Sequence, residues 1–116
     1  MAIYFNVRFR GTSLRIEVLE ARFDARVGDA LVNWLSMTPD IGFDRVILDL
    51  DAVEFMDSSG LGAIVSFWRR FRDSKEICIA GVKPAVRDLL CITRMDYVLP
   101  ISVSTQASYT GVQRQT

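Results

Sequence analysis

The sequence predicts a single α/β domain in which helices pack against a mixed β-sheet. Two short alternating runs open the chain, and strand-like segments then alternate with amphipathic helical segments, which is the order typical of α/β domains. The length of 116 residues, half of them hydrophobic and 24% charged, fits one globular unit. We therefore expect one domain over residues 1–103 and a polar tail over residues 104–116 that is either a weak helix or disordered.

An antiparallel hairpin is predicted at the start of the chain. Apolar and polar side chains alternate over residues 3–10 and again over residues 14–20, and this period of two is typical of half-buried strands. Gly11 and Thr12 separate the two runs, and a short connection that contains glycine favours a hairpin.

Three helices are predicted from a change to helical spacing. The first follows Asp24, a candidate N-cap, and ends at Thr38-Pro39; its apolar stripe consists of Val27, Ala30, Leu31, Trp34 and Leu35. The second begins at Ser58, with a stripe made of Leu61, Ile64, Val65, Trp68 and Phe71. The third begins at Pro84, a residue that suits a first helical turn, and places Val86, Leu89, Leu90 and Thr93 on one side.

Buried strands are predicted between these helices. Residues 45–50 and 76–80 are short runs rich in β-branched side chains, as expected of central strands. Residues 97–103 are expected to add a short final strand that is interrupted at Pro100.

Charge and residue types exclude several classes of function. The 14 basic and 14 acidic residues balance, so no net charge favours nucleic acid or an anionic membrane. The chain has no histidine, which excludes Ser-His-Asp and Cys-His nucleophiles and histidine metal sites. Cys78 and Cys91 match no zinc or redox motif, so we expect them to be buried, with no metal or cofactor and a cytoplasmic location.

The most unusual chemistry lies at the predicted start of the second helix, in the segment Asp57-Ser58-Ser59-Gly60-Leu61-Gly62. The loop before it is acidic, with Asp49, Asp51 and Glu54, and it follows a strand end, where α/β proteins tend to place ligands and reactive groups. One interpretation is ordinary helix capping by Asp57 or a serine. The other is that an exposed Ser58 hydroxyl accepts phosphate, which would meet unpaired N–H groups at the helix start and add negative charge beside Asp57.

The segment Phe55-Met56-Asp57-Ser58-Ser59-Gly60-Leu61-Gly62, preceded by Val46-Ile47-Leu48-Asp49-Leu50, resembles the core of bacterial anti-sigma factor antagonists of the STAS fold. The similarity extends through residues 83–90 and covers roughly residues 10–102. One difference is Ala21-Arg22-Phe23-Asp24, where many members have Gly-Glu-Leu-Asp. The resemblance implies a STAS-like fold and a non-enzymatic protein.

It also implies a phosphorylation switch. In this family the first serine of the motif, here Ser58, is phosphorylated by an anti-sigma factor that is a serine kinase, and a PP2C-type phosphatase reverses the modification. The unphosphorylated antagonist binds the kinase and frees the sigma factor. The surface for the partner is then expected to involve Asp24, Asp57, Ser59, Gly60 and Leu61.

Other functions compete with this switch. A serine nucleophile would need a general base, for which Lys83 is the only candidate, and a phosphoacceptor Asp49 or Asp51 would need an acidic pair where Arg10-Gly11-Thr12 stands. A STAS-like domain can also be a permanently bound subunit of a transport or signalling assembly. Phe67 bears on that alternative, because it points away from the predicted stripe and is either an exposed interface anchor or packed under a loop.

Overall fold

The computed structural model describes residues 3–102, which form a mixed β-sheet with helices on one face. The main sheet has the order β1-β2-β4-β6, formed by Phe5–Arg10, Ser13–Val18, Arg45–Asp49 and Glu76–Ala80. A separate pair joins β3 (Arg22–Phe23) to β5 (Phe55–Met56). The helices are α1 (Ala25–Met37), α2 (Ser58–Phe71) and α3 (Pro84–Ile92), followed by a 3₁₀ turn, Met95–Tyr97. The predicted α/β class with an opening hairpin is confirmed.

The opening hairpin sets the register of the sheet. Strands β1 and β2 are antiparallel, with Arg10 opposite Ser13 across a two-residue loop. Gly11 has a φ of +60°, a backbone conformation that glycine adopts without steric cost. Strand β2 then pairs in parallel with β4, and β4 pairs in parallel with β6.

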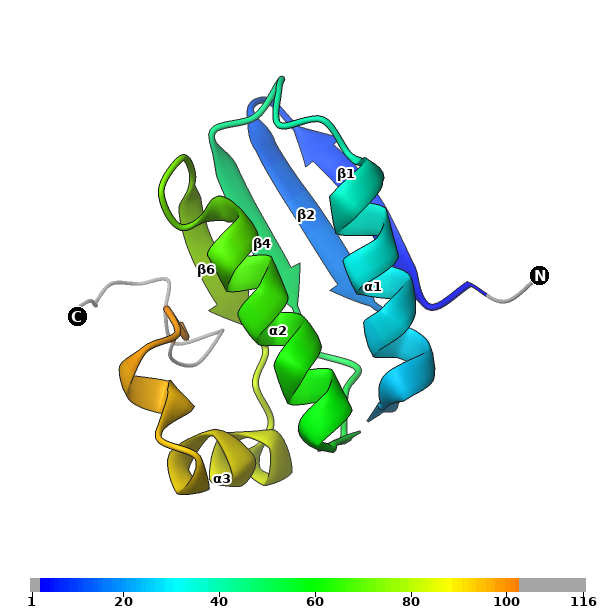
Figure 1. Cartoon of the computed structure of the whole chain (residues 1–116), viewed down its shortest axis with the longest axis vertical. Coiled ribbons are helices and arrows are strands. Elements are labelled where there is room, and N and C mark those ends of the chain that lie inside the picture. The colour runs from blue at the N-terminus through cyan, green and yellow to red at the C-terminus, as the bar shows by residue number, and fades with distance from the viewer. Residues whose placement is uncertain (1–2, 103–116) are drawn as a thin grey trace.

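Two helices cover one face of the sheet, and the third lies at its end. Figure 1 shows α1 and α2 side by side in front of the strands, with α3 below them. The side chains that face these helices alternate along each strand, as Leu14, Ile16 and Val18 do in β2, and all three are buried. Arg15 and Ile47, at intervening positions, lie on the opposite face.

Helix α2 buries a face that only partly overlaps the predicted stripe, with Ile64 and Phe71 common to both. Its buried residues are Gly60, Ala63, Ile64, Phe67 and Phe71. Leu61, Val65 and Trp68, expected in the stripe, are only half-buried. The helix is apolar over a wide arc, and the small residues Gly60 and Ala63 let it approach its neighbours closely, which decides the side that faces inward.

Two smaller predictions are wrong. The expected final strand is reduced to a single bridge between Ile79 and Ile101, preceded by the 3₁₀ turn; Val103 and the predicted tail lie outside the described residues. Cys91 is exposed instead of buried, and Cys78 is half-buried. Partial desolvation and the nearby Asp96 carboxylate raise the pKa of the Cys91 thiol.

Candidate functional site

The short β3–β5 pair brings the starts of two helices together. These strands run parallel, with Phe23 opposite Met56, so the next residues, Asp24 and Asp57, follow matching positions. Asp24 caps α1 and Asp57 caps α2. Both helices therefore begin at the same end of the molecule, at the bottom of Figure 1. This strand pair was not predicted, although an apolar residue followed by an aspartate occurs at both places in the sequence.

Asp57 satisfies the backbone at the start of α2. Its Oδ1 accepts hydrogen bonds from the N–H groups of Ser59, at 3.0 Å, and Gly60, at 3.1 Å. The capping interpretation is thus confirmed, with Asp57 and not a serine as the cap. It also corrects the expectation that a phosphate would meet unpaired N–H groups here, because Asp57 already occupies two of those donors.

Ser58 is the first residue of α2, and it is exposed. Its hydroxyl makes no hydrogen bond with any residue in the described part of the chain. Ser59, which follows it, is also exposed, whereas Leu61 is half-buried. Ser58 therefore presents a free hydroxyl to solvent immediately after a capping carboxylate.

Asp24 lies on the neighbouring helix start and is held by Arg26. Its carboxylate accepts hydrogen bonds from the Arg26 backbone N–H and from Arg26 Nε, each at 3.2 Å. Partial desolvation opposes ionisation of Asp24, but these hydrogen bonds and the charge of Arg26 outweigh it, so the pKa of Asp24 lies below its usual value. The site thus places a carboxylate at each helix start, and the one at the start of α1 is paired with Arg26.

Gly60 and Gly28 allow the start of α2 to pack closely against β3 and α1. A Cβ atom on Gly60 would lie 2.2 Å from the carbonyl oxygen of Phe23 and 2.8 Å from Cγ of Met56. A Cβ atom on Gly28 of α1 would lie 3.2 Å from the carbonyl oxygen of Ser59. Gly60 is buried, so its place in the site is beneath the surface and not in contact with a partner, contrary to the prediction.

Two other acidic residues near the motif, Asp49 and Glu54, have basic partners of their own. Asp49 is buried on the open face of the sheet, where its Oδ2 accepts a 2.8 Å hydrogen bond from Nη2 of Arg15. Glu54 pairs with Lys83 at 3.6 Å, which engages the only lysine considered as a base for a serine nucleophile. Within residues 3–102, no group of three or more His, Cys, Asp or Glu side chains is arranged to hold a metal ion.

The predicted aromatic anchor is wrong, and another aromatic residue is exposed instead. Phe67 is fully buried, with its ring 5.6 Å from that of Phe71. Phe55, in β5, is 46% exposed, and the Arg22 guanidinium lies 4.9 Å from its ring centroid. Phe55 lies only three residues before Ser58 in the sequence. No feature of the sequence pattern, however, indicated that its side chain is exposed.

Comparison with known proteins connects this geometry to one domain family. The sequence model of the STAS domain matches residues 13–108. An anti-sigma-factor antagonist (STAS) domain protein from Planctomyces limnophilus is similar in structure, with a TM-score of 0.71 and 20% identity over 90% of this chain and 93% of that one.

Two further solved structures share the fold. The phosphorylated form of the Bacillus cell fate determinant SpoIIAA has a TM-score of 0.67 and 15% identity, covering 91% of this chain and 96% of that one. A sulfate transporter family protein from Wolinella succinogenes also has a TM-score of 0.67, with 18% identity over 78% of this chain and 75% of that one. In residues 3–102 of the present chain, no helix has the length and apolar character needed to span a bilayer.

Proposed function

Because this chain belongs to the STAS domain family, we propose that it acts as an anti-sigma factor antagonist whose docking is switched by phosphorylation of Ser58. In this proposal the unphosphorylated chain binds an anti-sigma factor that is a serine kinase. Phosphate on Ser58 releases it, and a PP2C-type phosphatase restores the binding form. The kinase holds the ATP, and this chain is its protein substrate in the cytoplasm, without catalysis of its own.

The observation that carries the proposal is the exposed Ser58 hydroxyl at the start of α2. A kinase must reach the acceptor oxygen. Because the Ser58 hydroxyl makes no hydrogen bond to the described residues, none has to be broken for the kinase to reach it. The flanking Asp57, Ser59 and Leu61, with Asp24 on the neighbouring helix start, are the residues we propose for the partner surface. Phe55 extends this surface as an exposed aromatic side chain.

The capping geometry favours repulsion as the basis of release. Asp57 already neutralises the helix start by accepting from Ser59 and Gly60, so a phosphate on Ser58 would add about −1.5 to −2 charges next to an existing carboxylate. The added charge faces solvent in the free protein. It becomes costly when a partner covers the site, because like charges repel more strongly away from water.

The two adjacent exposed serines give a matched test. The purified chain is incubated with the cognate kinase and Mg-ATP, and the phosphorylated residue is located by mass spectrometry. Wild type and Ser59→Ala should gain one phosphate on Ser58, while Ser58→Ala should gain none. Phosphate only on another residue would refute the assignment.

Binding measurements separate the switch from the modification. Ser58→Ala should bind the kinase as wild type does and should not be released in the presence of ATP. Ser58→Asp should weaken the complex by about 1–3 kcal/mol, roughly 5- to 150-fold in Kd. Equal affinities of Ser58→Asp and wild type would contradict switching by charge.

The transporter-family neighbour supports a second candidate, a subunit docked permanently within a transport or signalling assembly. The same helix face would then bind its partner without modification. A phosphorylated species of this protein in cells favours the switch. Stable co-purification with a membrane complex, unchanged in Ser58→Asp, favours the permanent subunit.

A further inference from the structure

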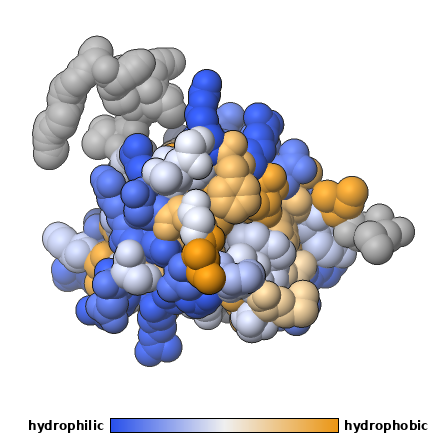
Figure 2. All heavy atoms as spheres, turned by 90° about the horizontal axis from the view of Figure 1, so that it is seen from above, coloured by the Kyte–Doolittle hydropathy of each residue, from blue (hydrophilic) through white to orange (hydrophobic). Residues whose placement is uncertain are grey.

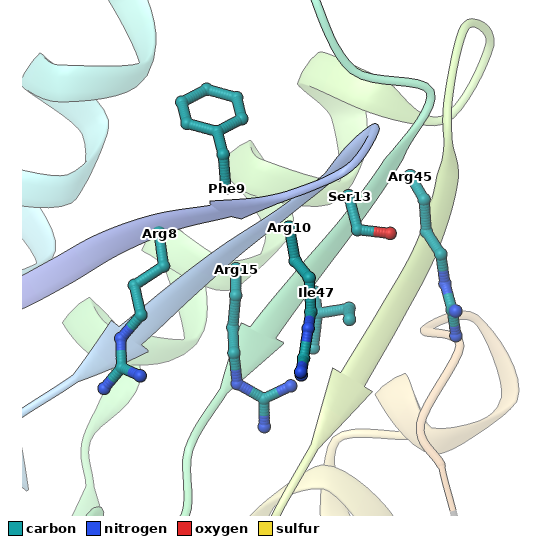
Figure 3. Close-up of a pocket in the computed structure, with 7 residues that line it drawn as sticks. All are labelled: Arg8, Phe9, Arg10, Ser13, Arg15, Arg45 and Ile47. Carbon is teal, nitrogen blue, oxygen red and sulfur yellow. The ribbon is translucent and has the colours of Figure 1, made fainter.

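The open face of the sheet, opposite α1 and α2, carries a concentration of arginines at the hairpin end. A cavity of about 480 Å³ is lined there by residues of β1, β2 and β4: Arg8, Phe9, Arg10, Ser13, Arg15, Arg45 and Ile47. Figure 3 shows the four arginines pointing to one side of the sheet, while the Phe9 ring points to the other. A chain with no net charge thus places four guanidinium groups around one hollow.

Acidic neighbours neutralise only two of these arginines. Arg8 pairs with Glu17 at 3.2 Å, and Arg15 pairs with Asp49 at 2.8 Å. Arg10 and Arg45 make no ion pair and no side-chain hydrogen bond with any of residues 3–102, although Glu76 occupies the register position next to Arg45. These two guanidinium groups are therefore available to a ligand.

The two unpaired arginines share one row of the sheet. Arg10 is opposite Ser13, and Ser13 is opposite Arg45, so a half-buried hydroxyl stands between the two arginine positions. Guanidinium groups bind phosphate and carboxylate through pairs of parallel hydrogen bonds, and a hydroxyl can donate one more. Beside this row, the half-buried Ile47 offers an apolar contact.

We propose that this hollow binds a small oxyanion that carries two or more phosphate or carboxylate groups. Its volume falls within the range of small-molecule sites, which favours a compact ligand. The chain's own residues 103–116 contain no Asp or Glu, so they do not supply the complementary charge. The site is independent of the proposed switch, because Arg10, Ser13 and Arg45 lie where β1 ends and where β2 and β4 begin, whereas Ser58 follows the end of β4.

Figure 2 views the molecule from this hairpin end and shows hydrophobic residues gathered amid hydrophilic ones. Phe9 is 62% exposed and belongs to the helix side, where its ring lies 6.2 Å from that of Phe43. The exposed Phe9 ring therefore lies on the opposite side of the sheet from the arginine row.

The test is an NMR titration of the full chain with tripolyphosphate and, separately, with citrate, following backbone amides and arginine Nε–Hε signals. At least one anion should give saturable shifts at Arg10 and Arg45. The double variant Arg10→Gln/Arg45→Gln should bind it at least about tenfold more weakly, since two charge-assisted contacts are lost. Preference for tripolyphosphate would identify a phosphate ligand, and preference for citrate a carboxylate ligand.

The control removes the same charge elsewhere. Arg69→Gln/Arg87→Gln replaces two exposed helix arginines and should leave the affinity within about twofold of wild type, as should Ser58→Ala. Urea unfolding should give the same midpoint for both double variants, because none of the four side chains is buried. An equal loss in the control pair, or no saturable shift with either anion, would overturn the proposal. So would binding confined to phosphatidylglycerol vesicles, which would instead assign the face to a membrane.

Discussion

At the residue scale, the decisive contact of the site is the Asp57 cap. One carboxylate oxygen satisfies two backbone N–H groups, and it does so beside the proposed phosphorylation site. The hydrogen bonds of Asp57 and its charge are therefore two properties whose effects can be separated.

Replacing Asp57 should separate these effects. Asp57→Ala leaves two N–H groups without the cap and should lower the free energy of unfolding by about 1 kcal/mol, within a range of roughly 0.5–2 kcal/mol. Asp57→Asn keeps an oxygen acceptor and should retain most of that stability while losing the charge. Urea denaturation measures both, with Asp73→Ala, whose side chain is 94% exposed, as the control. An equal loss in the alanine and asparagine variants would show that charge, not capping, stabilises this helix.

The two glycines of the motif should respond in opposite directions. Gly60→Ala would place a methyl carbon 2.2 Å from the carbonyl oxygen of Phe23, which is a severe steric clash. The substitution should therefore destabilise the domain by more than about 2 kcal/mol. Gly62→Ala meets nothing within 4 Å and should stabilise the helix by about 0.5–1 kcal/mol. Thermal unfolding compares the pair directly, and a stabilising Gly60→Ala would contradict the close packing of α2 on β3.

At the element scale, the connection from α1 to β4 is fixed to the far end of α2. Asp40 in this connection forms ion pairs with Lys75, at 3.1 Å, and Arg70, at 3.6 Å. The hydrogen bond from Lys75 is the main cause that lowers the pKa of Asp40, and the positive charges of both partners add to it.

The ion pair between Asp40 and Lys75 should contribute less to the stability of the fold as the pH falls. Since the pKa of Asp40 is lower in the folded protein, the pair contributes above the unfolded value of about 3.9, and the contribution is lost as the pH falls through the folded value. Asp40→Asn should therefore make the loss of stability between about pH 5 and pH 2 less steep. Urea midpoints measured across this range test it, with Asp73→Asn as the control. If the urea midpoint of Asp40→Asn fell with pH as steeply as that of wild type, Asp40 would not contribute to the acid dependence of stability.

The elements also show what sequence could and could not predict. Helical spacing and helix-start residues located α1, α2 and α3, because Asp24, Asp57 and Pro84 act locally. The exact orientation of α2 was missed, although Ile64 and Phe71 were placed correctly, because Leu61 and Trp68 are apolar like the buried Phe67. Only the close approach permitted by Gly60 and Ala63 selects the buried face, and that depends on distant segments. The β3–β5 pair was missed because two-residue strands carry no periodic signal.

At the scale of the whole molecule, one continuous hydrophobic core joins the sheet to its helices. Aromatic contacts run from Phe67 to Phe71, at 5.6 Å, and on to Phe43, at 5.7 Å, which links α2 to the segment before β4. The position of Ser58, at the start of α2 and next to the start of α1, depends on this whole packing. The sequence therefore did not predict the β3–β5 pair that brings the two helix starts together.

A single core predicts cooperative unfolding. Trp34 lies on α1 and Trp68 on α2, so tryptophan fluorescence reports packing of both helices while far-ultraviolet circular dichroism reports the backbone. The two urea transitions should coincide in midpoint and slope. Ser58→Asp should change the free energy of unfolding by less than about 0.5 kcal/mol, because Ser58 is exposed. Separate transitions would show that one helix melts before the sheet.

The paired helix starts also bear on how a regulator would associate. Asp24 and Asp57 fix the backbone of both turns by hydrogen bonds, and Gly28 of α1 lies against the Ser59 carbonyl of α2. A surface so held in advance loses little conformational entropy when it is covered. If this surface docks as proposed, the domain should bind with little change of its own shape. A change of charge at Ser58 should then act mainly on the lifetime of the complex.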